Sequence, residues 1–203
     1  MDEQATQAIE QKQDAPVMDI LVAPDSRLKI VADRVKEPSV EDQKLIDEMI
    51  RTMKASDGIG LAATQVGFNK RIIVMDVEPL TAYEDSDPTT VKEGKFEMIN
   101  PVIVSRAGKA KWAEGCLSVP GFKDVVTRDL VIEVSYLDRY GVQKDLKASG
   151  LLSACIQHEI DHLDGKLFVD HLSRLKRDII VSKLKKFRKH GTMIVRPSAG
   201  LTL

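Results

Sequence analysis

The run His158-Glu159-Ile160-Asp161-His162 constrains this chain more than any other feature of its sequence. At about 3.6 residues per turn, a helix places His158 and His162 on one face, where both imidazoles can reach a single ion. Glu159 lies beside them, close enough to act on a water molecule at the metal but offset from the ligand face. The run therefore predicts a helix that carries two metal ligands and a general base.

Composition limits the kinds of protein that this chain can be. It has 203 residues, 43% hydrophobic and 30% charged, which suits one domain with a sizeable core. No apolar run approaches the roughly 18 residues of a membrane-spanning helix. Residues 1–16 lack Arg and an apolar signal core, so no secretory or mitochondrial address is expected, and a cytoplasmic location is. We expect this acidic, Gln-rich stretch to be a disordered tail before a single catalytic domain at 17–203. Two cysteines are too few for a disulfide framework, so each is expected to be a core thiol or a metal ligand.

Hydrophobic periodicity and capping residues predict three helices. Ser39 is a candidate N-cap for a helix that runs to a stop near Gly58. Ser149 is a candidate N-cap for the motif helix, whose body is 151–163 and which ends before Gly165. A last helix covers about 172–189.

Segments rich in Val and Ile predict the strands. Residues 71–76 are expected to form a buried strand, and 96–104 and 125–137 two more, with a hairpin around Gly141. Residues 78–95 contain prolines and acids with little periodicity, so we expect a mobile surface loop. The fold class is then α+β, with mixed or antiparallel strands packed around a central metal-binding helix and a C-terminal helix.

Two histidines leave the metal site incomplete, and the sequence downstream offers no recognised third ligand. One large group of zinc proteases uses a histidine six residues after the second motif histidine, but Phe168 occupies that place here. Another group uses a downstream glutamate, and no Glu follows Glu159. Asp170, His171 and His190 remain as downstream candidates without a recognised spacing. The third ligand is therefore expected upstream.

Geometry separates the two cysteines as candidates for that ligand. Cys155 shares a helical face with the histidines, but its side chain starts about 10 Å along the axis from His162, so we expect it to line the pocket. Cys116 follows a glycine between predicted strands, where a separate element can present its thiolate to the ion. Cys116 is the favoured third ligand.

Three segments together carry a resemblance to a known family. They are residues 58–65 (GIGLAATQ), 114–118 (EGCLS) and 157–162 (QHEIDH). In order and spacing they resemble the three motifs of the peptide deformylases, and the resemblance extends from about Asp19 to Phe168. The run at 157–162 is moderately specific by itself, whereas the three segments together are very specific.

The resemblance implies an enzyme that hydrolyses the N-formyl group of formylmethionine on newly synthesised polypeptides and releases formate. It implies that Cys116, His158 and His162 hold one divalent metal, usually Fe(II), for which Zn(II), Ni(II) or Co(II) can substitute. It also implies that Glu159 is the general base and acid, and that Gln65 and the backbone N–H of Leu117 face the substrate carbonyl. Two imidazoles and a thiolate suit zinc as well, so the residues themselves leave the metal open.

Small residues near the motifs suit the approach of an extended peptide. We expect Ile59 and Gly60 to bond substrate backbone as an added strand would, and Gly115 to do so from the other side. Ile59, Leu151 and Cys155 are the hypothesised lining of a pocket for the methionine side chain, and core packing is the competing interpretation for each. A phosphate-binding loop is disfavoured, because alanine at position 63 breaks the G-x-G-x-x-G spacing.

The segment from His171 to Leu203 holds nine Lys or Arg and one Asp, a local charge of +8 in a chain of formal net charge -1. The plainer interpretation is a docked helix with a solvated charged face. Ribosome contact is the alternative, since such a segment would favour a phosphate backbone. No membrane or DNA partner is expected.

Two other function classes compete with a deformylase. A metalloprotease would cleave internal peptide bonds and needs a third ligand that the sequence does not supply. A non-catalytic protein would close its metal site with a fourth protein ligand.

Overall fold

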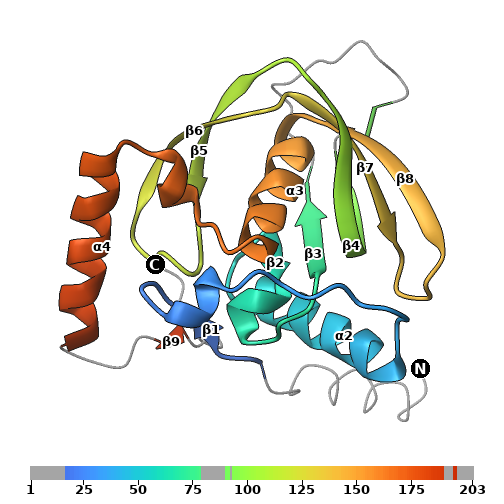
Figure 1. The fold of residues 1–203 in the computed structure, drawn as a ribbon, viewed down its shortest axis with the longest axis horizontal. Helices are drawn as coiled ribbons and strands as arrows, with labels where there is room; N and C mark the ends of the chain where they lie inside the picture. The colour runs from blue at the N-terminus through green and yellow to red at the C-terminus, as the bar shows by residue number, and fades with distance from the viewer. Residues whose placement is uncertain (1–16, 79–89, 92, 190–193, 196–203) are drawn as a thin grey trace, which may run out of the picture.

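The computed structural model describes residues 17–78, 90–91, 93–189 and 194–195. Figure 1 shows helix α3 (Gly150–Leu163) in the middle of the fold, between the strands of the large sheet and a separate hairpin. The predicted α+β class and the central helix are confirmed. Within the described ranges, the helices are too short or too polar to span a lipid bilayer.

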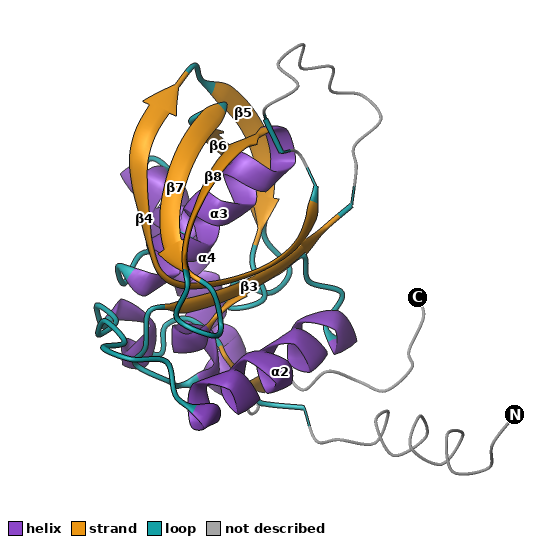
Figure 2. Ribbon diagram, turned by 90° about the vertical axis from the view of Figure 1, so that its right-hand side faces the viewer, coloured by secondary structure: helices purple, strands orange, loops and turns teal. Residues whose placement is uncertain are grey.

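A five-stranded antiparallel sheet forms the main scaffold. Its order is β2-β3-β4-β7-β8, and Figure 2 shows it curving around α3. The bounds are β2 (Gly60–Ala62), β3 (Ile72–Val77), β4 (Gly94–Ala107), β7 (Val131–Leu137) and β8 (Gln143–Ser149). The hairpin expected around Gly141 joins β7 to β8, and this glycine adopts a φ of 83° in the turn.

Strand β3 is covered on both faces, as its continuous apolar run predicted. Ile73 and Met75 pack in the core that α3 fills, whereas Ile72 and Val74 pack in a second core beneath helix α2 (Val40–Ala55). The predicted cap of α2 is present: the Ser39 hydroxyl accepts from the backbone N–H of the third helical residue, which completes a capping box. Two cores therefore share one strand.

Two short sheets lie outside the main one. Strands β5 (Ala110–Gly115) and β6 (Lys123–Arg128) form an antiparallel hairpin on the far side of α3 from the large sheet. Strands β1 (Ile20–Leu21) and β9 (Ile194–Val195) form an antiparallel pair. Sequence reasoning did not predict β5, whose apolar positions are few and separated by lysine and glutamate.

The prediction of one strand over 125–137 was wrong, because the structure has two strands separated at Asp129 and Leu130. Gln157 of α3 accepts a hydrogen bond from the Asp129 backbone N–H at 2.9 Å and donates one to its carbonyl at 2.9 Å. This backbone is thus bonded to the helix instead of to a neighbouring strand, and β6 and β7 join different sheets.

Helix ends differ from expectation in two places. Ser149 occupies the N-cap position of α3, but its hydroxyl makes no capping hydrogen bond. The last helix, α4 (Arg174–Lys189), begins two residues later than predicted, because Leu172 is extended after a 3-10 turn at Phe168–His171. The loop expected at 78–95 and the tail at 1–16 fall largely outside the described residues, although β4 already begins at Gly94.

Replacing Gly165 by alanine should destabilise the end of α3 strongly. Gly165 has a φ of 70°, and a Cβ there would lie 2.6 Å from the Lys29 carbonyl oxygen. Strain and overlap together should lower the free energy of unfolding by on the order of 2 to 4 kcal/mol. Gly121→Ala is the matched control, because its φ of 78° is similar but no atom lies within 4 Å of the added Cβ. Urea denaturation of both variants should show about 1 kcal/mol for the control, and equal losses would contradict the role of overlap.

Candidate metal centre

The three predicted metal ligands converge at one point between α3 and the segment after β5. The His162 Nε2 atom lies 3.2 Å from the Cys116 Sγ atom and 3.2 Å from the His158 Nε2 atom. The ligand atoms of all three residues lie within 4.8 Å of one another. One helical turn supplies the two imidazoles, and the thiol comes from a separate element, as the sequence suggested.

The donor set and its spacing fit a divalent metal. At a metal–nitrogen distance of about 2.1 Å, two tetrahedral ligands are separated by about 3.4 Å, close to the separation of the two imidazoles. The Glu114 carboxylate lies 2.9 Å from His158 Nδ1, so it can accept the proton there and leave Nε2 free to bind a metal. Two borderline imidazoles and one soft thiolate form a ligand set suited to Fe(II), Co(II), Ni(II) or Zn(II).

The two imidazoles have opposite electrostatic surroundings. Burial alone would lower the pKa of His158, but hydrogen bonds to Cys116 and Glu114 outweigh it and raise this pKa well above its usual value. Burial and the neighbouring His158 both lower the pKa of His162. Burial would raise the pKa of Glu114, yet hydrogen bonds from Arg128 and His158 hold it at about 2, so Glu114 stays ionised.

Glu159 is buried beside the donors, and no group among the described residues forms a hydrogen bond with its Oε2 atom. Burial raises the pKa of this carboxyl to about 7, so it can exchange a proton near neutral pH. Its position depends on Gly60 of β2, where a Cβ would lie 2.4 Å from Glu159 Oε1 and 2.9 Å from Cys155 Sγ. Only glycine leaves room for the carboxylate there.

Gln65 lies next to the thiol on a short 3-10 turn after β2. Its Oε1 atom accepts a hydrogen bond from the Ala62 backbone N–H at 2.8 Å, which fixes the side-chain amide. Its Nε2 atom is 3.6 Å from Cys116 Sγ and 3.1 Å from Ser118 Oγ. The buried Gln65 and half-buried Leu117 both line the pocket beside the metal donors.

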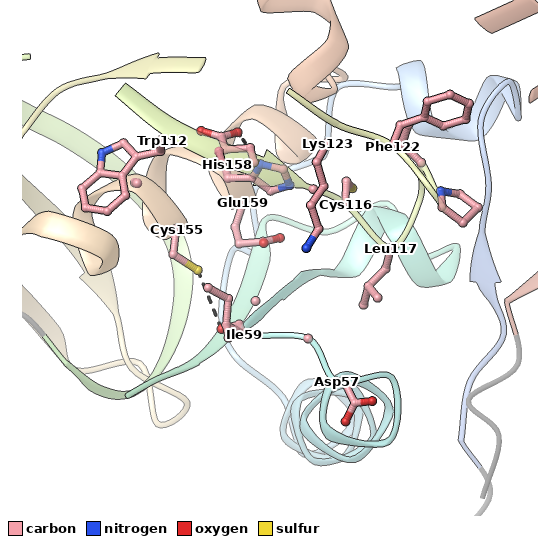
Figure 3. Close-up of a pocket in the computed structure, with 18 of the residues that line it drawn as sticks. Asp57, Ile59, Trp112, Cys116, Leu117, Phe122, Lys123, Cys155, His158 and Glu159 are labelled. Carbon is pink, nitrogen blue, oxygen red and sulfur yellow. Dashed lines mark hydrogen bonds and ion pairs between the residues drawn. The ribbon is translucent and has the colours of Figure 1, made fainter. Parts of the chain in front are cut away.

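A cavity of about 680 Å³ opens beside these groups. Figure 3 shows Glu159 and Cys155 near Ile59, with Lys123 extending from the other side. The predicted substrate-contact residues Ile59, Gly60, Gly115 and Cys155 all line it. Cys155 Sγ lies 3.7 Å from the Ile59 carbonyl oxygen, and its pKa is raised by burial, then by Glu159. Further lining residues are Asp57, Trp112, Phe122 and Leu151.

Two of the three downstream candidates for the third ligand, Asp170 and His171, make other contacts. Asp170 forms an ion pair with Lys29 at 2.5 Å, and His171 Nε2 lies 2.6 Å from Asp161 Oδ2. His190 lies outside the described residues.

Sequence reasoning missed Arg128 and the role of Glu114. Arg128 is buried and donates two hydrogen bonds to Glu114, at 2.7 and 2.9 Å, and another to Asp161 at 2.5 Å. The acidic residue two positions before Cys116 was a visible signal, because a ligating histidine generally needs such a partner. No signal in the sequence linked Arg128 to it.

Comparison with known proteins gives a consistent family. Residues 17–178 match the family model described as polypeptide deformylase. A peptide deformylase of Xylella fastidiosa strain M12 is 48% identical over 87% of this chain and 99% of its own length. One from Alkalilimnicola ehrlichii is 47% identical over 91% of this chain and 98% of its own length.

Solved structures give the same result. The crystal structure of a peptide deformylase from Ehrlichia chaffeensis has a TM-score of 0.81 and 43% identity, covering 86% of this chain and 98% of its own. Its complex with actinonin has a TM-score of 0.78 at the same identity, over 86% and 99% of the two chains.

Removal of the thiol should cost the protein its metal. We expect Cys116→Ser to lower the metal content well below one ion per chain, because a hydroxyl is a much poorer ligand for a soft or borderline ion. Cys155→Ser is the matched control, since it changes the other thiol and should retain the metal. Elemental analysis after desalting measures both, and a full complement of metal in Cys116→Ser would contradict the ligand assignment.

Proposed function

This chain belongs to the polypeptide deformylase family, and from that premise we propose how its residues remove a formyl group. The chain is a hydrolase that acts on N-formyl peptides, and the metalloprotease alternative is not favoured. The observation that carries the assignment of residues is the convergence of one thiol and two imidazoles beside a buried glutamate.

Cys116, His158 and His162 would hold the metal. A divalent ion bound there supplies Lewis acidity that activates water and polarises the formyl oxygen. We propose Fe(II) as the native ion, in line with the resemblance to the family, and Zn(II), Ni(II) or Co(II) as substitutes that the same donors accept. The geometry supports a three-ligand site with an open side, because the cavity adjoins Cys116 and His158.

Glu159 is proposed to move the proton. Its carboxylate takes a proton from the attacking water and then delivers it to the amine that departs from the formyl carbon. The products are formate and a peptide with a free amino terminus. The Oε2 atom supports this role, because it has no hydrogen-bond partner within the part of the chain that the structure describes.

Gln65 and Leu117 are proposed to stabilise the charge that develops on the former formyl oxygen. The Gln65 Nε2 group and the Leu117 backbone N–H would donate to this oxygen, and a preorganised donor in such a role contributes roughly 3 to 4 kcal/mol. The bond between Gln65 Oε1 and the Ala62 N–H supports this proposal, because it turns the amide nitrogen toward Cys116.

The peptide is proposed to lie along β2 and Gly115. Ile59 and Gly60 offer backbone groups on one side of the cavity, and Gly115 offers them on the other. The methionine side chain would occupy the apolar part of the cavity, lined by Ile59, Leu151 and Cys155. Residues 17–203 would form the single catalytic domain, which we place in the cytoplasm with nascent chains as substrates.

Formate release tests the function directly. Protein loaded anaerobically with Fe(II) should release formate from a formyl-Met peptide and leave the non-formylated peptide intact. Glu159→Gln should reduce this rate by at least about a hundredfold without loss of metal, because the amide cannot carry the proton. An enzymatic formate assay with parallel metal analysis measures both effects. Absence of formate from metal-loaded parent protein would refute the assignment.

Ribosome contact through the basic helix is a separate proposal. Lys185 and Lys186 are exposed on α4, whereas Ile180 and Leu184 are buried in the core, so deletion of the helix would damage the fold. Reversing both lysines to glutamate should weaken ribosome binding and flatten its dependence on salt, by about one unit of slope for each phosphate that is no longer bound. Ribosome pelleting across a salt series measures this. Reversal of the exposed Lys36 and Lys44 is the control, and equal binding by both double variants would contradict the proposal.

A further inference from the structure

Arg128 forms a buried cluster of charges that the proposed chemistry does not use. The residue ends β6 and is 5% exposed. Its Nε and Nη2 atoms donate to the two oxygens of Glu114, and its Nη1 atom donates to Asp161 Oδ2 at 2.5 Å. His171, on the outer side, lies 2.6 Å from the same Asp161 oxygen and 3.4 Å from Arg128 Nη1.

The two acceptors belong to the two elements that supply the metal donors. Glu114 lies on β5, two residues before Cys116, and Asp161 lies on α3, directly before His162. The β5–β6 hairpin is a separate two-stranded sheet, so no strand pairing connects it to the sheet on which α3 packs. One guanidinium therefore links the element that carries the thiol to the element that carries both imidazoles.

Glu114 transmits this link to a metal ligand. Its Oε2 atom accepts from Arg128 Nη2 and also lies 2.9 Å from His158 Nδ1. A bidentate contact fixes the plane of the carboxylate, and the carboxylate in turn fixes the tautomer and ring orientation of the imidazole. Arg128 thus acts on His158 through one intermediate residue.

A contribution to stability alone is a weak explanation for this cluster. Burying a guanidinium and two carboxylates costs desolvation that their attraction often only offsets, and apolar replacements in other proteins are frequently as stable. The planar fork of arginine does supply a fixed direction for each of its bonds, which lysine lacks. The cluster therefore provides fixed orientations for the carboxylates that Arg128 binds.

We propose that Arg128 is a positioning residue that sets the spacing between Cys116 and the two imidazoles and thereby slows loss of the metal. The inference rests on the proposed function for the identity of the metal ligands. It concerns retention of the ion, and Arg128 is not assigned any contact with substrate.

Metal release measures this role without any assay of activity. Protein loaded with Co(II) is mixed with excess chelator, and loss of the cobalt–thiolate absorption gives the release rate. Arg128→Met should release the ion about ten- to hundredfold faster than the parent, the usual effect of losing a group that orients a ligand. Arg128→Lys retains the positive charge but not the planar, forked guanidinium. Its release rate should therefore lie between that of the parent and that of Arg128→Met.

Arg139→Met provides the matched control. Arg139 also binds Glu97 through two nitrogens and Asp47 through one. None of these three residues lines the cavity or belongs to the metal donors. This variant should lower the melting temperature and leave the release rate at the parent value. A release rate accelerated as much as in Arg128→Met would overturn the proposal, because general loosening would then explain both.

The remaining outcomes are also decisive. If Arg128→Met does not fold, Arg128→Lys decides the matter, and a parental release rate in that variant would overturn the proposal. Parent protein that binds no cobalt would overturn both the ligand assignment and this inference. Parent protein that retains cobalt in an Arg128-dependent way but releases no formate would refute the proposed function while supporting the inference.

Discussion

The burial of polar groups on one helix is the constraint on which the rest of the structure depends. Helix α3 lies in the core and carries Gln157, His158, Glu159 and His162, and a buried polar group without a partner costs free energy. Surrounding residues provide partners for two of them: Gln157 is bonded to the Asp129 backbone and His158 to Glu114. Buried atoms of Glu159 and His162 have no partner among the described residues, and these belong to the proposed proton carrier and a proposed ligand.

This constraint also explains the layout around the helix. Because the Asp129 backbone bonds Gln157, it does not continue a strand, and β6 and β7 belong to different sheets. The β5–β6 hairpin then lies where Cys116 can approach the imidazoles and where Arg128 can reach both Glu114 and Asp161. The cavity lies between this hairpin and β2, with the metal donors at its side.

The sequence allowed the motif helix, α2 and β3 to be predicted, because their signals are local, and it also suggested that Cys116 lies beside the two histidines. The spacing of His158 and His162 implies a helical turn, and Ser39 caps its helix three residues from its partner. The choice of Cys116 required the elimination of downstream residues and the distance of Cys155 from His162 along the helix axis. It did not require knowledge of the fold.

The remaining features depend on contacts between residues distant in sequence. The break at Asp129 arises from a bond to a residue 28 positions away, and Arg128 meets Asp161 across 33 positions. Strand β5 has few apolar residues because the face with Trp112 and Glu114 borders the cavity, whereas Lys111 and Ala113 on the other face are exposed. Hydrophobic periodicity reports only on residues close in sequence, so these long-range contacts could be identified only from the three-dimensional structure.

Strand β3 has a consequence for how the molecule opens. Because Ile73 and Met75 face α3 while Ile72 and Val74 face α2, the strand contributes side chains to both hydrophobic cores. Neither core can come apart without exposing one side of it. Amide protons of β3 should therefore exchange with solvent only when the whole domain unfolds. Helices α3 and α2 should lose their protection from amide exchange in the same event.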